Sequence, residues 1–416
     1  MSFTRDDALA RDAADPLARF RDRFDFGRST CIYLDGNSLG RPPRAAIARI
    51  RRAMEDEWAG ELVAAWDHWI ELAREAGDVL AGIVGAAPGE VVVSDSTSVN
   101  LYKIAAAALD ARGDRRVIVT DDDNFPTDRY ILEGLARARG LELRSIRTDI
   151  DEGVTLARVK EALGTDVALL SLSHVAYRSG AIADLKGITA AAHQAGALVL
   201  WDLCHSAGAV PVDLAGAGVD LAVGCTYKHL NAGPGAPAFL YVRADLQPQL
   251  RQPIWGWFGQ RDQFDMGPEY QPADGIERFL VGTPPVLSLY GVLEGARLTA
   301  EAGMAAIHDK ARALTSYAVS LYDAWLAPHG FRLASPRDAH VRGAHITLEH
   351  PEAWRLCRAW KDAGTIPDFR TPDRLRIGVA PLYTRYVDLY DGLSRLRDIA
   401  ENKAYEAYPA TRSRVT

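Results

Sequence analysis

The sequence predicts an α/β protein with a mostly parallel central sheet, helices on both faces, and a smaller α/β domain at the C-terminus. Two observations predict this class. Between residues 90 and 201, short apolar runs alternate with helical segments of about 10–15 residues, the pattern of βαβ units. After a long helical region, two more strands and two more helices follow. We expect an N-terminal segment (1–60) that packs on the small domain, a large domain (61–300) and a small domain (301–416).

The N-terminal part is predicted to be mainly helical. Thr4 followed by Asp7 marks a helix start, and Pro43 suits the first turn of another helix. Trp66 and Trp69 share one helix face, and core packing is the simplest account of them. The predicted elements here are a helix at 8–24, a strand at 32–34 and helices at 45–58 and 66–84.

The βα units and the C-terminal elements follow in order. The predicted strands are 91–93, 116–120, 143–146, 167–173, 198–201, 219–225 and 239–242, and the helices between them are 99–109, 126–138, 156–163 and 185–194. Residues 252–285 are rich in Gly, Pro and aromatic residues and show little periodicity, which is usually functional in a compact domain. The remaining elements are a helical region at 286–326, strands at 344–348 and 374–379, and helices at 354–361 and 387–399.

Composition excludes several classes of protein. The chain has 416 residues and a formal net charge of -7 without a basic stripe, so nucleic acid is not an expected partner. The acidic N-terminus lacks the apolar core of a signal peptide, and no apolar run approaches the ~18 residues of a membrane span. The four cysteines have no CxxC spacing, so we expect neither a metal site nor a disulfide framework, as in a reducing cytoplasm.

An acid and an amine follow two neighbouring strands in the stretch 201–234. Asp202 stands where one strand ends, and Lys228 follows the next apolar run. Ligands of open α/β sheets bind at the carboxyl ends of strands. A lysine there can form a Schiff base with pyridoxal phosphate, and an acid can hold the protonated pyridine nitrogen. The alternative is an ordinary strand-end acid and a surface lysine.

Two further strand ends carry groups that suit the same cofactor. Ser96, Thr97 and Ser98 open a helix, where free N–H groups and hydroxyls bind phosphate, although plain N-capping explains such a triplet equally well. No GxGxxG stands at this turn, which argues against a dinucleotide. Phe125 could stack on a flat ring, with Asp128 as a second acid near it. Alternatively, Phe125 belongs to the core and Asp128 is a first-turn acid.

Longer motifs resemble the kynureninase family, in the class V branch of fold-type-I enzymes that use pyridoxal phosphate. The matching stretches are YLDGNSLG at 33–40, STSVN at 96–100, NFPTD at 124–128, SHVAYRSG at 173–180, WDLCHSAGAVPVDL at 201–214, CTYKHLNAGPG at 225–235, GWFG at 256–259 and RIGVAPLYT at 376–384. They cover nearly the whole chain in the right order. Cys204 and His229 depart from the family pattern, in which alanine and tyrosine are usual, and both flank catalytic positions without replacing one.

The resemblance implies a role for each residue of the site. Lys228 carries the cofactor, Asp202 and Asp128 lie on its pyridine-nitrogen side with His205 nearby, and Phe125 stacks on the ring. The implied cofactor-binding set is Thr97, Ser98, Phe125, Pro126, Thr127, Asp128, Ser173, Asp202, His205, Tyr227, Lys228, Trp257 and Thr283. In this fold the site lies at a homodimer interface, so Trp257 and Thr283 are expected from the partner chain.

The resemblance also implies the substrate contacts. Arg376 would grip the substrate α-carboxylate, since a guanidinium binds carboxylates through two parallel hydrogen bonds. Ser38, Trp66 and Trp257 would line the pocket for the aryl group. Arg374 shares the strand face of Arg376, with a surface charge as its simplest role.

The implied reaction is hydrolysis of L-kynurenine, or of 3-hydroxykynurenine, to the anthranilate and L-alanine. Lys228 and Asp202 would be catalytic, and Tyr227 is the candidate acid or base beside the phosphate. A different reaction on the same scaffold, such as that of a cysteine desulfurase, needs a nucleophilic cysteine on a mobile loop. Cys357 lies instead in a predicted apolar helix, where we expect burial. A non-catalytic binding or scaffold protein would have no need of Lys228, Asp202 and Arg376 together.

Overall fold

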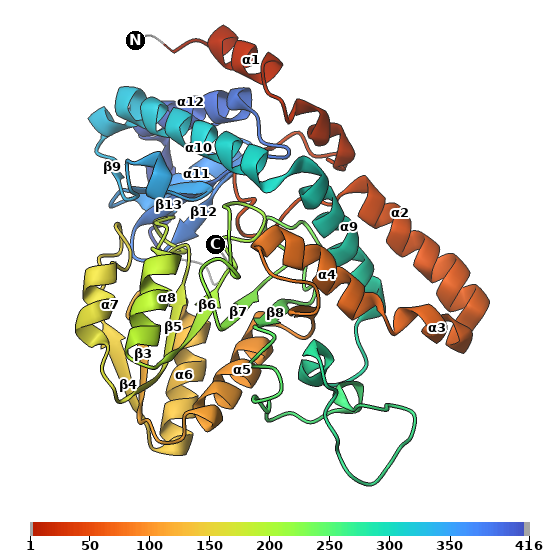
Figure 1. Cartoon of the computed structure of the whole chain (residues 1–416). Helices are drawn as coiled ribbons and strands as arrows, with labels where there is room; N and C mark the ends of the chain where they lie inside the picture. Colours follow the sequence, from red (N-terminus) through yellow and green to blue (C-terminus); the bar gives the residue numbers. More distant parts are fainter. Residues whose placement is uncertain (1–2, 412–416) are drawn as a thin grey trace.

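A seven-stranded sheet, hereafter the large sheet, forms the centre of the computed structural model, which describes residues 3–411 (Figure 1). The strand order is β2-β8-β7-β6-β5-β3-β4. Neighbouring strands from β7 to β4 are parallel, whereas β8 is antiparallel to both β2 and β7. The predicted, mostly parallel sheet is therefore confirmed. Its strands are β2 (Val91–Val93), β3 (Val117–Asp121), β4 (Glu142–Ile146), β5 (Val167–Ser173), β6 (Leu198–Asp202), β7 (Leu221–Gly224) and β8 (Phe239–Val242).

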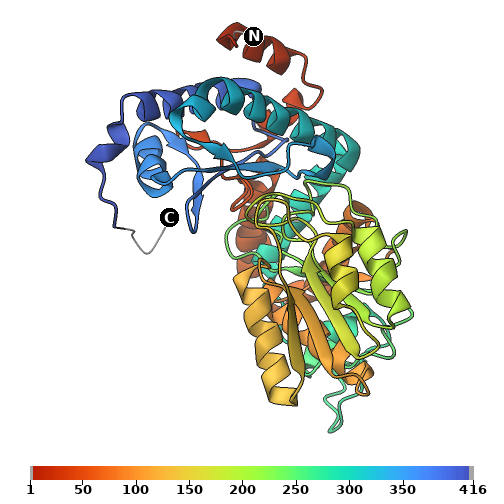
Figure 2. The same ribbon diagram turned by 90° about the vertical axis from the view of Figure 1, so that its left-hand side faces the viewer.

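Helices cover both faces of the large sheet, as the βαβ pattern predicted. The four that follow strands are α5 (Thr97–Ala111), α6 (Pro126–Arg139), α7 (Leu156–Ala162) and α8 (Leu185–Gln194). In Figure 2, α6 (light orange) lies on one side of the sheet, and α7 and α8 (yellow to yellow-green) lie on the other. Every residue of β2, β6 and β7 is buried, as expected for strands that are covered on both faces.

A second, antiparallel sheet, hereafter the small sheet, has the order β12-β13-β10-β9. It has its own core, which includes Trp360, Leu375 and Ile377. The sequence did not predict β9 and β12, because strands of two or three residues carry no readable alternation. The division of the chain at residues 60 and 300 stays a prediction. The elements here are β9 (Arg332–Leu333), β10 (His345–Glu349), β12 (Asp368–Arg370), β13 (Arg374–Gly378), α10 (Met304–Leu321), α11 (Ala353–Asp362) and α12 (Tyr386–Glu401).

Three predicted helices are interrupted. The first ends as α1 (Arg5–Ala13) before a 3₁₀ turn, because the residue before Pro16 is disfavoured in the helical region. The helix predicted at 66–84 divides into α3 (Trp66–Trp69) and α4 (Leu72–Val84). The long C-terminal one divides into α9 (Val286–Ala302) and α10 at Gly303, whose φ of 80° no helix adopts.

The N-terminal residues contact elements of both the large-sheet and the small-sheet regions. α1 packs on α12, β1 (Ile32–Tyr33) pairs with β11 (Thr365–Ile366), and α2 (Arg44–Arg52) packs against α9. Within residues 3–411, no helix combines the length and apolar character that crossing a bilayer requires.

Candidate active site

A cavity of about 590 Å³ lies where the parallel strands of the large sheet end and the small sheet begins. This is the place where open α/β sheets bind their ligands. Most of the predicted site residues line it: Ser38, Thr97, Ser98, Phe125, Thr127, Asp128, Ser173, Asp202, His205, Tyr227, Lys228 and Arg376. The sheet thus brings together side chains that lie more than 300 residues apart in sequence.

Two carboxyl groups meet at the floor of the cavity. Asp202 ends β6, and its Oδ1 accepts the Cys204 N–H at 2.6 Å. Asp128 lies in the first turn of α6 with its Oδ2 unpartnered among the described residues. Burial, and then the adjacent Asp202, raise the pKa of Asp128 well above its usual value. A cation placed here would relieve this repulsion, so the pair fits the protonated nitrogen of a pyridine ring.

Lys228 follows β7 and reaches the same cavity. Its Nζ lies 3.1 Å from Nε2 of His205 and 5.9 Å from the ring centre of Phe125. Burial, followed by the charge of Lys228, lowers the pKa of His205 well below its usual value, so the imidazole is neutral. Its Nδ1 has no partner among the described residues. Amine, acid pair and aromatic ring therefore surround a space that suits a flat aldehyde cofactor.

The loop 35–40 crosses directly over the backbone that carries Lys228. The Gly40 N–H donates to the carbonyl of Tyr227 at 2.8 Å. A Cβ at Gly40 would lie only 2.4 Å from the carbonyl oxygen of Lys228, so no other residue fits without movement. This close approach brings Ser38 to the cavity.

The N-terminus of α5 supplies the phosphate-binding groups. Ser96 is the N-cap and accepts the Val99 N–H at 3.3 Å, so the capping account holds for this serine. The Thr97 and Ser98 hydroxyls remain at the cavity wall, beside the unpaired N–H groups of the first turn. Ser173, at the end of β5, donates to Oδ1 of Asn124 at 2.7 Å.

Arg376 enters the cavity from β13 of the small sheet. It is 1 % exposed, and its two terminal nitrogens donate to Oγ of Ser38 (2.7 Å), Oδ2 of Asp368 (2.5 Å) and the carbonyl of Tyr177 (2.7 Å). Its Nε has no partner among the described residues. The guanidinium is held in place while one donor is left for a ligand.

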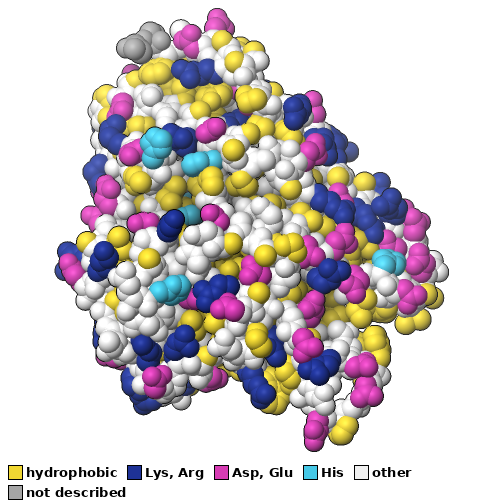
Figure 3. Space-filling view, viewed as in Figure 1, with side chains coloured by type: hydrophobic (Ala, Val, Ile, Leu, Met, Phe, Trp, Pro, Cys, Tyr) yellow, Lys and Arg dark blue, Asp and Glu magenta, His cyan; other side chains and the backbone are white. Residues whose placement is uncertain are grey.

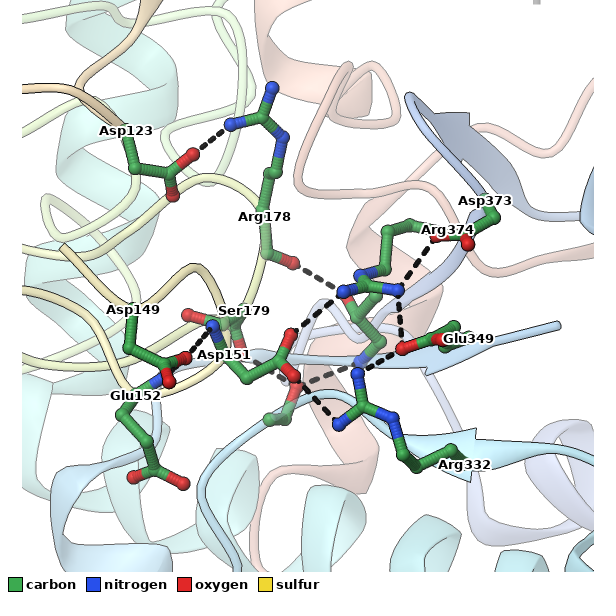
Figure 4. Close-up of polar contacts among 12 residues, drawn as sticks. Asp123, Asp149, Asp151, Glu152, Arg178, Ser179, Arg332, Glu349, Asp373 and Arg374 are labelled. Atoms are coloured by element: carbon green, nitrogen blue, oxygen red, sulfur yellow. Dashed lines mark hydrogen bonds and ion pairs between the residues drawn. The ribbon is translucent and has the colours of Figure 1, made fainter.

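The prediction that Arg374 is a surface charge is wrong. This side chain is 5 % exposed and forms ion pairs with Asp151 and Glu349 (Figure 4). Strand alternation correctly places it on the face of Arg376, but it does not line the cavity. Alternation gives the face of a residue, whereas the groups opposite it depend on the tertiary structure.

Four predicted residues lie away from the cavity of their own chain. Pro126 begins α6, and Trp66 packs against Trp69 and Phe258, with ring centres 5.4 and 6.0 Å apart. Trp257 is 39 % exposed, and Thr283 is exposed as well.

Sequence reasoning missed several residues that line the cavity, among them Tyr177, Cys204 and Arg370. The rings of Tyr177 and Phe125 pack edge to face, with their centres 5.3 Å apart. Arg370 lies on the same strand as Asp368, β12, which is too short for its alternation to be read from the sequence.

The two departures from the family pattern lie beside the site. Sγ of Cys204 accepts the Cys225 N–H at 3.2 Å and lies 3.7 Å from Oγ1 of Thr97. His229 is buried, and neither ring nitrogen has a partner within residues 3–411; burial lowers its pKa to about 3. Neither displaces a predicted group. The described residues contain no cluster of acids, histidines and cysteines able to hold a metal ion.

Comparison with known proteins agrees with the resemblance that the sequence motifs indicate. The family model for aminotransferase class-V matches residues 32–352. A kynureninase of Pseudomonas fluorescens is 43% identical over 410 residues, covering 97% of both chains. One from Burkholderia pseudomallei (strain 1106a) is 45% identical over 422 residues, covering 99% of this chain and 100% of the other. Among solved structures, the cysteine desulfurase of Thermococcus onnurineus NA1 superposes with a TM-score of 0.79 at 18% identity, covering 97% of this chain and 100% of that one.

Proposed function

The chain belongs to the kynureninase family of the class-V aminotransferases, and from this premise we propose how its cavity performs the reaction. The protein is a pyridoxal-phosphate enzyme that hydrolyses L-kynurenine to anthranilate and L-alanine. Identity above 40% over nearly the whole of both chains is the observation that carries this assignment. The structural neighbour, at 18% identity, supports the fold alone.

The proposed cofactor contacts follow from the cavity. Lys228 would hold the aldehyde carbon covalently, Phe125 would stack on the ring, and Asp202 with Asp128 would hold the protonated pyridine nitrogen. Thr97 and Ser98 bind the phosphate at the start of α5. When bound, the cofactor supplies an electron sink that makes the Cα proton of the substrate acidic.

Two side chains move protons in this proposal. Lys228, once released from the cofactor, takes the Cα proton, and the neutral His205 3.1 Å away accepts a hydrogen bond that orients the amine. Burial, then the neighbouring thiols, raise the pKa of Tyr227 above its usual value, so the phenol stays protonated. It is therefore suited to donate a proton to the carbon that is freed when water cleaves the Cβ–Cγ bond.

Arg376 holds the amino-acid end of the substrate in this proposal. Ser38, which we expected in the aryl pocket, accepts a hydrogen bond from Arg376 at 2.7 Å, so we propose that it serves the same end. Nε of Arg376, which has no partner among the described residues, donates to one carboxylate oxygen, and Nη2 completes the fork by exchanging its hydrogen bond to Ser38 for one to the substrate. Holding the α-carboxylate there turns the Cα proton toward Lys228, and such orientation is a large part of enzymatic rate enhancement.

We propose a homodimer with shared active sites. Trp257 and Thr283 lie in the segment 252–285, face away from their own cavity and are exposed. Large apolar side chains are exposed on the same segment and on the turn before α3: Trp58, Leu62, Val63, Trp255, Phe264 and Met266. On the face drawn in Figure 3, hydrophobic side chains gather at the lower right, where α3 lies. A second copy on this surface would bury them and bring Trp66 and Trp257 toward the aryl end of the partner's cavity.

The C-terminal cysteine that we considered for the desulfurase alternative is not suited to be its nucleophile. Cys357 lies in α11 and is fully buried, as expected, and burial raises the pKa of its thiol to about 12. A persulfide-forming cysteine must instead be exposed and ionised.

We also propose a cytoplasmic location. All four cysteines are free thiols, and Cys204 and Cys225 contact each other without forming a disulfide. Neighbouring cysteines that remain free thiols are typical of a reducing compartment.

Product analysis with purified enzyme tests the function. We expect L-kynurenine to give anthranilate and alanine in equal amounts, with 3-hydroxykynurenine assayed beside it to establish the preference. L-Cysteine is the control for the alternative reaction. Faster release of sulfide from cysteine than of anthranilate from kynurenine would contradict the assignment.

A further inference from the structure

A group of charged side chains outside the cavity joins the large-sheet side of the molecule to the small sheet. We call it the charge seam and define it as Asp151, Arg332, Glu349 and Arg374 (Figure 4). Oδ1 of Asp151 lies 3.1 Å from Arg374 and its Oδ2 lies 2.7 Å from Arg332. Glu349 contacts both arginines as well. Asp151 is the member that comes from the large-sheet side, between β4 and α7.

The loop that carries Asp151 has a fixed shape. Oδ1 of Asp149 accepts the N–H groups of Asp151 (2.8 Å) and Glu152 (3.3 Å), and the Gly153 N–H donates to the Asp149 carbonyl at 2.8 Å. Gly153 has a φ of 76°, and a Cβ there would lie 2.9 Å from that of Ala181. The carboxylate of Asp151 is therefore presented to the small sheet from a rigid support.

The charge seam lies one row away from Arg376. Arg332, Glu349 and Arg374 are register partners across β9, β10 and β13. The next row on the same face pairs Thr347 with Arg376, about 7 Å further along the strand. Contacts that hold the first row of residues in place therefore also hold the second row in place.

The second row also contacts the large-sheet side, but through uncharged acceptors. The carbonyls of residues 177–179 accept hydrogen bonds in turn from Arg376 (2.7 Å), Thr347 and Ser335 (2.5 Å). The bonds from Thr347 and Ser335 are neutral and about half as strong as charge-assisted ones, whereas the bond from Arg376 has a charged donor. Asp151 adds two ion pairs between the two sheets at this edge.

We propose that Asp151 is a positioning residue for Arg376. By binding Arg332 and Arg374, Asp151 holds β13 in the position in which Arg376 can contact the substrate carboxylate. This inference rests on the proposed role of Arg376. Asp151 touches neither cofactor nor substrate, and its effect is confined to the amino-acid end of the cavity.

Asp151→Asn tests the proposal, because it keeps the shape and removes the charge. We expect the KM for L-kynurenine to rise about tenfold while kcat stays within about twofold. Cofactor binding should not change. The dissociation constant of 2-aminoacetophenone should also stay the same, because this ligand has the aryl ketone but no α-carboxylate.

Glu152→Gln is the matched control. It makes the same charge change on the same loop, and the Glu152 side chain is exposed and points away from the arginines (Figure 4). Arg332→Gln is a second, milder variant, since that side chain is 54% exposed. It should raise KM in the same direction.

The outcomes separate the two hypotheses. If Arg376→Lys lowers kcat/KM but Asp151→Asn behaves like Glu152→Gln, the positioning role is wrong and the role of Arg376 stands. If Arg376→Lys leaves kcat/KM unchanged, the carboxylate assignment fails and the positioning role fails with it. Equal weakening of kynurenine and 2-aminoacetophenone binding by Asp151→Asn would show a general structural effect and would also overturn the proposal.

Discussion

At the scale of single residues, the substrate end of the cavity depends on the geometry of one guanidinium. Arg376 is buried and is held by Asp368, Ser38 and the Tyr177 carbonyl, with Nε left free. Lysine keeps the charge but has no planar fork. The orientation of the substrate, rather than its charge neutralisation, is therefore what Arg376 provides.

We predict that Arg376→Lys lowers kcat/KM for L-kynurenine by roughly 10²-fold, the scale expected when a bound substrate loses its orientation. The affinity for pyridoxal phosphate should not change, because Arg376 contacts substrate only. Steady-state kinetics and cofactor titration measure both quantities.

Arg337→Lys is the control for this substitution. Arg337 is 62% exposed and pairs with Asp323 at 2.7 Å. Arg374 would not serve, since its buried ion pairs make any change there costly. Indistinguishable kinetics of the Arg376 and Arg337 variants would show that the carboxylate binds elsewhere.

The sequence allowed the residues at strand ends to be predicted, but not their tertiary partners. Asp202 and Lys228 follow apolar runs, and parallel strands bring such residues to one edge of a sheet. Tyr177 and Arg370 reach the same cavity from an irregular segment and a three-residue strand, where no periodicity indicates direction. The contacts of Arg374 could not be predicted either, because Asp151 lies 223 residues away.

At the scale of elements, one buried carboxylate joins four helical segments. Glu57 lies in η2 (Ala53–Glu61), which continues α2 as a π-helix. It accepts hydrogen bonds from Trp69 of α3 (2.7 Å) and Tyr290 of α9 (2.6 Å), and it lies 2.6 Å from Arg49 of α2. Burial alone would raise its pKa, but hydrogen bonds from Tyr290, Trp69, His68 and Arg49 together lower it to about 2.

We predict that Glu57→Gln lowers the free energy of unfolding by about 1–3 kcal/mol at pH 7, because charged hydrogen bonds are lost. A carboxylate whose folded pKa lies below its ordinary value of 4.5 stabilises the fold above that pH and loses this effect as pH falls toward 2. The difference between variant and parent should therefore shrink below pH 4.5.

Urea denaturation at several pH values measures this difference. Glu55→Gln, at an exposed position of the same segment, is the control and should have little effect at any pH. A destabilisation by Glu57→Gln that is constant from pH 7 to pH 3 would mean that packing, and not the charge, is what the residue contributes.

The positions of the elements were predicted better than their ends and breaks. All seven strands of the large sheet and the helix at 185–194 occur where the apolar patterns placed them. The break at Gly303 could not be foreseen, because the apolar pattern continues through it and a glycine inside a helical pattern is often tolerated.

At the scale of the whole molecule, two residues that we expected at the cofactor do not line the cavity of their own chain. Trp257 and Thr283 are exposed on the segment 252–285, which carries little regular structure beyond two short 3₁₀ turns (Figure 1). Such a segment gains a defined role when it completes the cavity of a partner.

We predict that two defective chains complement each other. In a mixed dimer of Lys228→Ala and Trp257→Ala chains, one of the two sites has an intact Lys228 and receives an intact Trp257. Co-expression with different affinity tags should therefore give more activity than either homodimer. Lys228→Ala mixed with Asp202→Asn is the control without rescue, because both residues serve the cavity of their own chain. Equal behaviour of the two mixtures would exclude a shared site.

The covalent position of the cofactor tests the central claim most directly. The enzyme loaded with pyridoxal phosphate is reduced with borohydride, digested and mapped by mass spectrometry, for the parent and for Lys228→Ala. We predict that the parent carries the adduct on Lys228 and that the variant carries none and does not hydrolyse L-kynurenine. An adduct on another lysine, or kynurenine hydrolysis by Lys228→Ala at the parent's rate, would contradict the account.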